Sequence, residues 1–168
     1  IHSVVFGGFA SNELASRIDD SKAKLLVTAS CGFEPGRTVE YKPLVDEAIK
    51  QAQHKIDKMI LFQRKNHEVK LNAPKEISWD EATSNAKDTD CVEMNSNELA
   101  YILYTSGTTG TPKGIVRDIG GHIVALKWTM KNIYNIDTDD VWWSASDIGW
   151  IVGHSYIVYA PLFKGCTT

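Results

Sequence analysis

The segment Tyr101-Ile-Leu-Tyr-Thr-Ser-Gly-Thr-Thr-Gly-Thr-Pro-Lys-Gly114 decides how the rest of the chain is interpreted. Its first four residues are apolar or aromatic, which is typical of a buried strand. Glycines, hydroxyl side chains and a lysine follow directly. Gly107 and Gly110 allow tight turns that bring backbone N–H groups close to an anion, and Lys113 adds a positive charge suited to phosphate oxygens. The pattern predicts a strand that runs into a polyphosphate-binding loop.

Two other interpretations of the same residues compete with this one. A cluster of Gly, Ser and Thr after a strand is often only a surface turn, and the residues alone leave that alternative open. A P-loop of the GxxxxGK[ST] type fails at two positions, because Pro112 stands where the second glycine is needed and Gly114 where a hydroxyl should hold Mg²⁺. Proline has no N–H to donate to a phosphate, so a P-loop kinase or ATPase is disfavoured.

Strand-like and helix-like patterns alternate in the first part of the chain. Strands are predicted at residues 1–6, 24–28 and 58–62. A helix that Ser11 could cap carries Leu14, Ala15 and Ile18 on one face, and a second helix is predicted at residues 43–56. Such alternation implies parallel strands with helices on the faces of the sheet. The predicted fold class is therefore α/β, with a mostly parallel sheet and flanking helices.

The rest of the chain gives further signals for helices and strands. Residues 63–77 are polar and predict a loop, and Ser78-Trp-Asp-Glu81 matches a capping box that opens a helix to about Ala86. Residues 99–105 form the predicted strand that leads into the loop. Downstream, the patterns predict a helix at residues 122–134, a tryptophan-rich strand at residues 141–145, and a helix at residues 153–163 that Pro161 interrupts.

The composition is that of an ordinary globular chain. Its 168 residues can bury a core, its formal net charge is −3, and it has no basic stripe and no run of about 18 apolar residues. We therefore expect a small-molecule substrate and no nucleic-acid or membrane partner. Cys31, Cys91 and Cys166 are odd in number and far apart, which favours a reducing compartment, the cytoplasm or the mitochondrial matrix. No CxxC or HxxxH motif supports a metal site held by the protein.

Residues 104–114 resemble the signature loop of the adenylate-forming, or AMP-binding, superfamily, which includes acyl-CoA synthetases, firefly luciferase and peptide-synthetase adenylation domains. Residues 147–156, Asp-Ile-Gly-Trp-Ile-Val-Gly-His-Ser-Tyr, resemble the next family motif in the form that acetyl- and propionyl-CoA synthetases carry. Residues 1–9, 34–37 and 165–168 are similar to the same short-chain branch, and nearest to its propionyl-CoA synthetase-like members. Because the chain begins without Met in an apolar run, we expect it to be an internal piece of a longer protein.

The resemblance implies an ATP-dependent acid–thiol ligase. In this family a carboxylate attacks the α-phosphorus of ATP to give an acyl-adenylate and pyrophosphate, with Mg²⁺ sharing the negative charge, and CoA then displaces AMP. Propionate is favoured as the acid, and the alternatives are an acetyl-CoA synthetase and a non-catalytic nucleotide-binding module. The residues implied to contact ATP are Thr105, Ser106, Gly107, Thr108, Thr109, Gly110 and Lys113.

The resemblance also implies an acyl pocket and a CoA site. Trp150 matches an aromatic residue beside the acyl group, although a side chain of this size also suits a core, and Ile151 matches a residue that lines a small acyl pocket. For CoA, the implied contacts are Arg37 and Val152. Here the chain departs from the acetyl-CoA synthetase pattern, because Glu34 replaces the first of two arginines and Val152 replaces a threonine.

By resemblance, the chain is part of the large N-terminal domain of such an enzyme. Residues 1–62 are expected to form a βαβ-type segment, residues 63–98 a connection, and residues 99–168 the phosphate-loop and acyl-pocket segment. The C-terminal domain and its adenylation lysine are expected beyond residue 168, so no catalytic residue is assigned and the chain alone is expected to be inactive. Asp147 and His154 are assigned structural roles, because an ionised carboxylate needs no general base.

Overall fold

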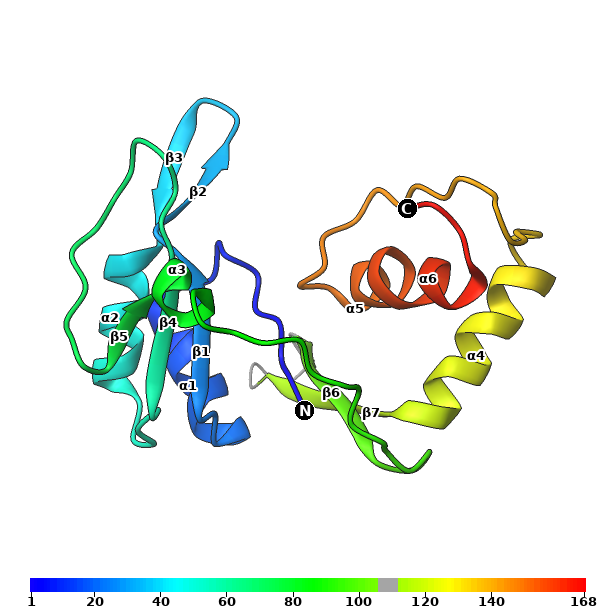
Figure 1. Ribbon diagram of the computed structural model, residues 1–168, viewed down its shortest axis with the longest axis horizontal. Helices are drawn as coiled ribbons and strands as arrows, with labels where there is room; N and C mark the ends of the chain where they lie inside the picture. The colour runs from blue at the N-terminus through cyan, green and yellow to red at the C-terminus, as the bar shows by residue number, and fades with distance from the viewer. Residues whose placement is uncertain (106–111) are drawn as a thin grey trace. The chain divides into compact units, whose positions relative to one another are not determined.

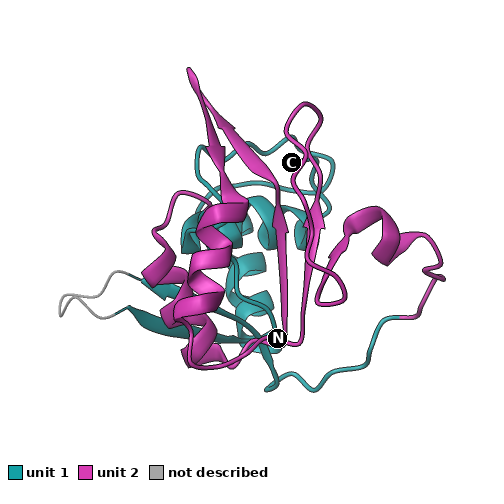
Figure 2. Ribbon diagram, turned by 90° about the vertical axis from the view of Figure 1, so that its left-hand side faces the viewer, with its two compact units in different colours: residues 1–6, 91–168 teal, residues 7–90 magenta. Residues whose placement is uncertain are grey.

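The computed structural model describes residues 1–105 and 112–168 and divides them into two compact units. One unit consists of Gly7–Asp90, and the other combines Ile1–Phe6 with Cys91–Thr168 (Figure 2). Each unit has its own hydrophobic core, and each is described by itself. The division into three functional segments stays a prediction.

A parallel three-stranded sheet forms the centre of the Gly7–Asp90 unit (Figure 1). Its strands are β1 (Leu25–Ala29), β4 (Lys58–Phe62) and β5 (Glu76–Ser78), in the order β1-β4-β5. β1 and β4 pair in register from Leu25 with Lys58 to Ala29 with Phe62. The predicted parallel pairing and the α/β class are confirmed. β5 falls in the stretch predicted to be a loop, because three residues are too few to show a period of two.

Two helices, α1 (Ser11–Ser21) and α2 (Tyr41–Gln51), share one core with β4. Their apolar stripes meet the face of β4 that carries Met59 and Leu61, since residues two apart in a strand point to the same side. Burying one large aliphatic side chain contributes about 1.5–3 kcal/mol, so this core accounts for much of the stability of the unit. The buried residues are Ala15, Ile18, Val45, Ala48, Ala52, Ile56, Met59 and Leu61.

Both helices differ from the prediction at one end. α1 begins at Ser11, after Ala10, without a side-chain cap, so the prediction that Ser11 caps this helix is wrong. α2 ends at Gln51 because Ala52 takes up extended backbone with a ψ of 136°. Ile56 lies outside the helix but is buried in the same core, which is why the apolar spacing continues to residue 56.

A hairpin that the sequence analysis did not anticipate joins β2 (Cys31–Glu34) to β3 (Arg37–Glu40) in antiparallel pairing. Pro35 and Gly36 form its two-residue turn, and Gly36 has a φ of +77°, a backbone conformation that favours glycine. The Pro-Gly pair is a known turn signal. The strands on either side are too short for their periodicity to be recognised.

The short helix α3 (Trp79–Thr83) follows β5. Ser78 caps it as predicted, because its Oγ accepts a hydrogen bond from the Glu81 N–H at 3.0 Å. The helix ends at Thr83, three residues before the predicted end.

The second unit is built on an antiparallel hairpin of β6 (Leu99–Thr105) and β7 (Lys113–Asp118). β6 is the strand predicted at residues 99–105, whereas β7 was not anticipated. Helix α4 (Ile119–Asn132) follows β7 directly, and Asp118 caps it by accepting a hydrogen bond from the Gly121 N–H at 3.0 Å. This cap explains why the helix begins three residues before the predicted start.

The C-terminal helical stretch is continuous from Ile151 to Lys164 but changes type twice. α5 (Ile151–Gly153) leads into a π-helix, η1 (His154–Tyr159), and then into α6 (Ala160–Lys164). Pro161 lies in the first turn of α6, where its missing N–H costs little. The proline therefore marks a change of helix type rather than a break.

Two predicted strands are wrong. In residues 1–6, only His2 makes a strand-like bridge, to Tyr101, and in residues 141–145 only Val141 does, to Thr167. A strand needs partners for its N–H and C=O groups along its length. Within the described residues, each of these apolar runs meets such a partner at a single position.

The core of the second unit is formed by Leu126, Met130, Ala160 and Cys166. All three cysteines of the chain are free thiols. Within the described ranges, no helix combines the length and the apolar character that crossing a membrane requires.

We expect Gly153→Ala to destabilise the protein. A Cβ added at Gly153 would overlap the carbonyl oxygen of Asp147 and lie 3.1 Å from the Ile148 nitrogen, and backbone atoms cannot rotate away as a side chain can. Overpacking of this kind costs about 1–3 kcal/mol. Thermal unfolding followed by circular dichroism measures the effect, with Val152→Ala at an exposed neighbouring position as the control. Equal melting temperatures for the two variants would contradict the close contact.

Candidate functional site

The β6–β7 hairpin places Thr105 opposite Lys113. Residues paired in this way have Cβ atoms about 4.5–5.5 Å apart, so a hydroxyl and an exposed lysine stand on the two strands that flank the predicted phosphate loop. The structure brings together the two members of the implied ATP-contacting set that it describes. The other members, Ser106, Gly107, Thr108, Thr109 and Gly110, lie outside the described residues.

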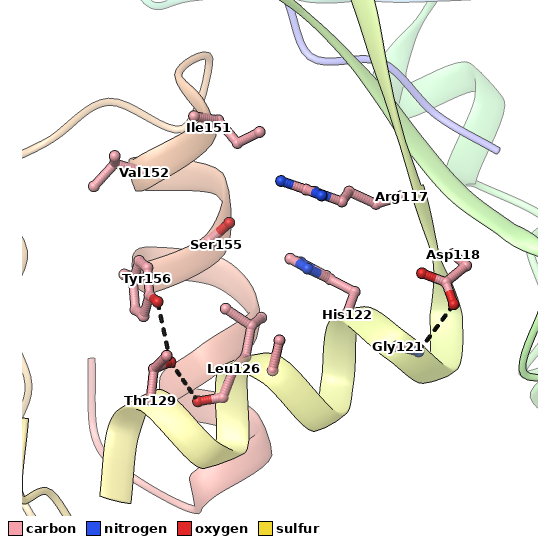
Figure 3. Close-up of a pocket in the computed structure, with 11 residues that line it drawn as sticks. Arg117, Asp118, Gly121, His122, Leu126, Thr129, Ile151, Val152, Ser155 and Tyr156 are labelled. Atoms are coloured by element: carbon pink, nitrogen blue, oxygen red, sulfur yellow. Dashed lines mark hydrogen bonds between the residues drawn. The ribbon is translucent and has the colours of Figure 1, made fainter. Parts of the chain in front are cut away.

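A cavity of about 320 Å³ lies at the opposite end of β7 (Figure 3). Its walls come from the end of β7, one face of α4, and the start of α5 and η1. Ile151 and Val152, which the resemblance assigns to the acyl pocket and to CoA, both line it, and with Leu126 they form an apolar side. The volume is at the small end of the range for ligand pockets. Arg117 contributes a cation to the other side.

The polar side of the cavity contains a buried hydrogen-bonded pair. The Tyr101 hydroxyl is 2.9 Å from Nε2 of His122, and the Tyr101 side chain is completely buried. Burial raises the pKa of Tyr101, and hydrogen bonds with Ser155 and Arg117 partly offset that effect. Tyr101 is therefore a neutral phenol near pH 7, not a phenolate that could pair with a cation.

Two cavity-lining residues, Ser155 and Tyr156, come from the π-helix η1. The Thr129 hydroxyl donates to the Leu126 carbonyl at 3.0 Å, so the Tyr156 hydroxyl donates to Thr129 Oγ1, also at 3.0 Å. This chain of hydrogen bonds ties η1 to α4 along the cavity. π-Helical turns occur frequently at functional sites, and nothing in the sequence pattern indicated this one.

Three histidines lie near Tyr101 and are held neutral. His154 Nδ1 is 3.1 Å from the carbonyl oxygen of Ile148, which can only accept, so Nδ1 carries the proton. The unprotonated Nε2 of His154 then accepts from His2 Nε2 at 2.9 Å. Burial lowers the pKa of His2, His122 and His154. Near pH 7 these imidazoles add hydrogen bonds to the site but no charge.

Trp150 takes a different position from its two neighbours in the motif. It precedes α5, is about half exposed, and is not among the residues that line the cavity. Its ring centroid lies 6.3 Å from that of Phe6. Its implied role beside the acyl group stays a prediction.

Arg37 lies in the other unit, at the start of β3, and is paired with Glu34. The Arg37 Nη2 and Nε atoms are 2.6 Å and 2.7 Å from Glu34 Oε2, and both side chains are exposed. The residue that departs from the family pattern thus neutralises the arginine implied to contact CoA.

Asp147 and His154 take part in local hydrogen bonds, as their assigned structural roles require. Asp147 Oδ1 accepts from the Gly149 N–H at 2.7 Å, and both ring nitrogens of His154 are engaged. The site residues that the sequence analysis missed are Tyr101, Arg117 and His122. Arg117 carries one signal, since it interrupts the apolar residues of β7.

Comparison with known proteins gives a consistent result. The family model described as AMP-binding enzyme matches residues 1–168. Acyl-CoA synthetase short-chain family member 3, mitochondrial, is 56% identical to this chain over 169 positions both in Pongo abelii and in Homo sapiens. Propionate–CoA ligase of Escherichia coli (strain K12) is 46% identical over 170 positions. These matches cover 100% of this chain but 25% of the two mammalian proteins and 27% of the bacterial one, so the chain spans about a quarter of the length of these relatives.

We expect the unit that contains the three histidines to lose stability as the pH falls below about 6.5. Their pKa values are lowered on folding, so the unfolded state binds more protons between those values and the ordinary histidine pKa of about 6.5. Stability is full above this range and declines as the pH falls through the lowered pKa values. Melting temperatures of the wild type and His154→Gln, measured between pH 5 and 7.5, should therefore converge at low pH. A constant difference across that range would contradict the argument.

Proposed function

Because this chain belongs to the AMP-binding enzyme family, we propose that the protein that carries it is an ATP-dependent acid–thiol ligase. It joins a short-chain carboxylate to CoA through an acyl-adenylate. The observation that carries the proposal is the position of β7, which begins at Lys113 beside the predicted phosphate loop and leads to a cavity that Ile151 lines. The relatives named acyl-CoA synthetase and propionate–CoA ligase support the same reaction class.

Thr105 and Lys113 hold the β- and γ-phosphates of ATP, together with residues 106–110. Lys113 is exposed at the start of β7, so its ammonium group is free to reach an anion from solvent. Hydrogen bonds from a charged donor to phosphate are shorter and stronger than neutral ones. Mg²⁺ enters with the nucleotide, because such ions are held largely by substrate phosphates and water. The described part of the chain contains no group of three His, Cys, Asp or Glu side chains that could hold it instead.

The acid is a short-chain carboxylate, with propionate favoured over acetate. Ile151, Val152 and Leu126 give the cavity an apolar side that suits an alkyl tail. One methylene in such a pocket is worth about 1–3 kcal/mol, so a pocket of this kind can rank acids by length. The relative named propionate–CoA ligase supports the three-carbon acid.

CoA binds through Arg37 and beside Val152. The ion pair between Arg37 and Glu34 is exposed on the β2–β3 hairpin, and pairs of this kind contribute about 0–1 kcal/mol. A phosphate of CoA can therefore displace Glu34 from the guanidinium at little cost. Val152 contributes an exposed apolar surface at the cavity, where a threonine would offer a hydroxyl.

The reaction takes place in a reducing compartment, the cytoplasm or the mitochondrial matrix. Cys31, Cys91 and Cys166 are all free thiols, which is typical of such compartments. The two mammalian relatives are named as mitochondrial proteins.

Lys113→Ala should weaken the use of ATP while leaving the fold intact, since an exposed lysine supports little packing. A charge-assisted hydrogen bond is worth about 1.5–3 kcal/mol, so kcat/KM for ATP should fall about 10- to 100-fold. The assay is carboxylate-dependent ATP–pyrophosphate exchange by the protein produced from its complete gene. Lys87→Ala, at another exposed lysine, is the control. Unchanged exchange kinetics in Lys113→Ala would remove the phosphate role.

Ile151→Trp should shift the preference toward shorter acids, because the larger side chain would fill part of the cavity that Ile151 lines. With about 1–3 kcal/mol per methylene, the ratio of kcat/KM for propionate to that for acetate should fall about 10- to 200-fold. Comparing acetate, propionate and butyrate decides the matter. The same ranking in wild type and variant would place Ile151 outside the acyl pocket, and a wild type that prefers acetate would favour an acetyl-CoA synthetase.

A further inference from the structure

Arg117 is a cation that faces the cavity without an acidic partner. In the described ranges, no carboxylate lies within ion-pair distance of its guanidinium. Its neighbour Asp118 is engaged elsewhere, because its carboxylate accepts from the Gly121 N–H and caps α4. The other three arginines each have an anionic or aromatic partner: Arg17 with Glu13 at 2.8 Å, Arg37 with Glu34 at 2.6 Å, and Arg64 over the Phe33 ring at 5.2 Å.

The surroundings of Arg117 orient it without neutralising it. Figure 3 shows its side chain extending from β7 toward Ile151 and Ser155, on the side where His122 also points. A hydrogen bond links it to Tyr101, which burial keeps as a neutral phenol, and His122 is a neutral imidazole for the same reason. The positive charge is therefore directed into a small cavity whose other side is apolar. That combination suits a ligand with one anionic end and a short alkyl tail.

The register of β7 relates this cation to the phosphate loop. Lys113 and Arg117 are four residues apart in one strand, so they point to the same face and lie about 13 Å apart along it. In the proposed function, the outer phosphates of ATP lie at Lys113. The α-phosphorus, which the acid must attack, then lies further from Lys113. A carboxylate held near Arg117 would approach it from the cavity.

We propose that Arg117 binds the carboxylate of the acid substrate and positions it for attack on ATP. The inference rests on the proposed function and names a residue that it does not use. In the step that follows, a carboxylate oxygen forms a bond to the α-phosphorus, and the bond from that phosphorus to the bridging oxygen breaks. Pyrophosphate leaves with the electron pair. The acid loses its charge when the adenylate forms, so the guanidinium holds the substrate more tightly than the product.

The test uses the protein produced from its complete gene and measures KM for propionate and for ATP in the exchange assay. Arg117→Gln should raise KM for propionate about 10- to 100-fold and leave KM for ATP within about twofold, since it removes only the carboxylate contact. Arg117→Lys keeps the charge but loses the two-pronged geometry, so its KM for propionate should lie in between. Lys127→Gln removes one positive charge from an exposed position on α4 and should change neither KM.

A neutral analogue separates carboxylate binding from a general effect on the cavity. Propionamide has the same shape without the charge, so as an inhibitor it should bind the wild type and Arg117→Gln equally. An unchanged KM for propionate in Arg117→Gln, with or without a lower melting temperature, would overturn the proposal and make Arg117 a residue of the fold. A parallel rise in KM for ATP would overturn it in favour of a nucleotide contact. If the wild type itself shows no carboxylate-dependent exchange, the ligase function fails as well.

Discussion

The pairing of β6 with β7 is the constraint on which the second unit depends. The ladder of backbone hydrogen bonds fixes Thr105 opposite Lys113 at one end and Tyr101 opposite Arg117 at the other. A strand that slipped by one residue would turn every side chain to the opposite face, so both cations owe their direction to this register. The hairpin also sets the start of α4 through Asp118. One short antiparallel element thereby links the phosphate end of the site to the cavity.

The α/β class and the longer elements could be predicted because their signals are local. β4 was predicted at the residues where it occurs, and β1 within one residue, since each is an apolar run bounded by polar side chains. β2, β3 and β5 have three or four residues each, too few for a period to emerge. Residues 1–6 and 141–145 failed for the opposite reason: they have the right composition, but partners for single bridges only.

The candidate site divides in a similar way between what a pattern can predict and what only packing can produce. Ile151 and Val152 were identified because they belong to a contiguous motif that resembles one in known enzymes. Arg117 and His122 have no such context, and they join Tyr101 only because β6, β7 and α4 meet. The exchange of an arginine for Glu34 was visible in the sequence, but its consequence, an ion pair with Arg37, required the hairpin that was missed.

The π-helix at His154–Tyr159 limits how this segment can change in evolution. A π-helical turn accommodates one more residue than an α-helical turn, and each residue of an α-helix rotates the side chains that follow by about 100°. Deleting a single residue there would restore an α-helix and turn everything after it, including Ala160 and Cys166 of the core. Substitutions in this stretch leave that phase untouched. Homologues should therefore differ in the chemistry of these six positions far more readily than in their number.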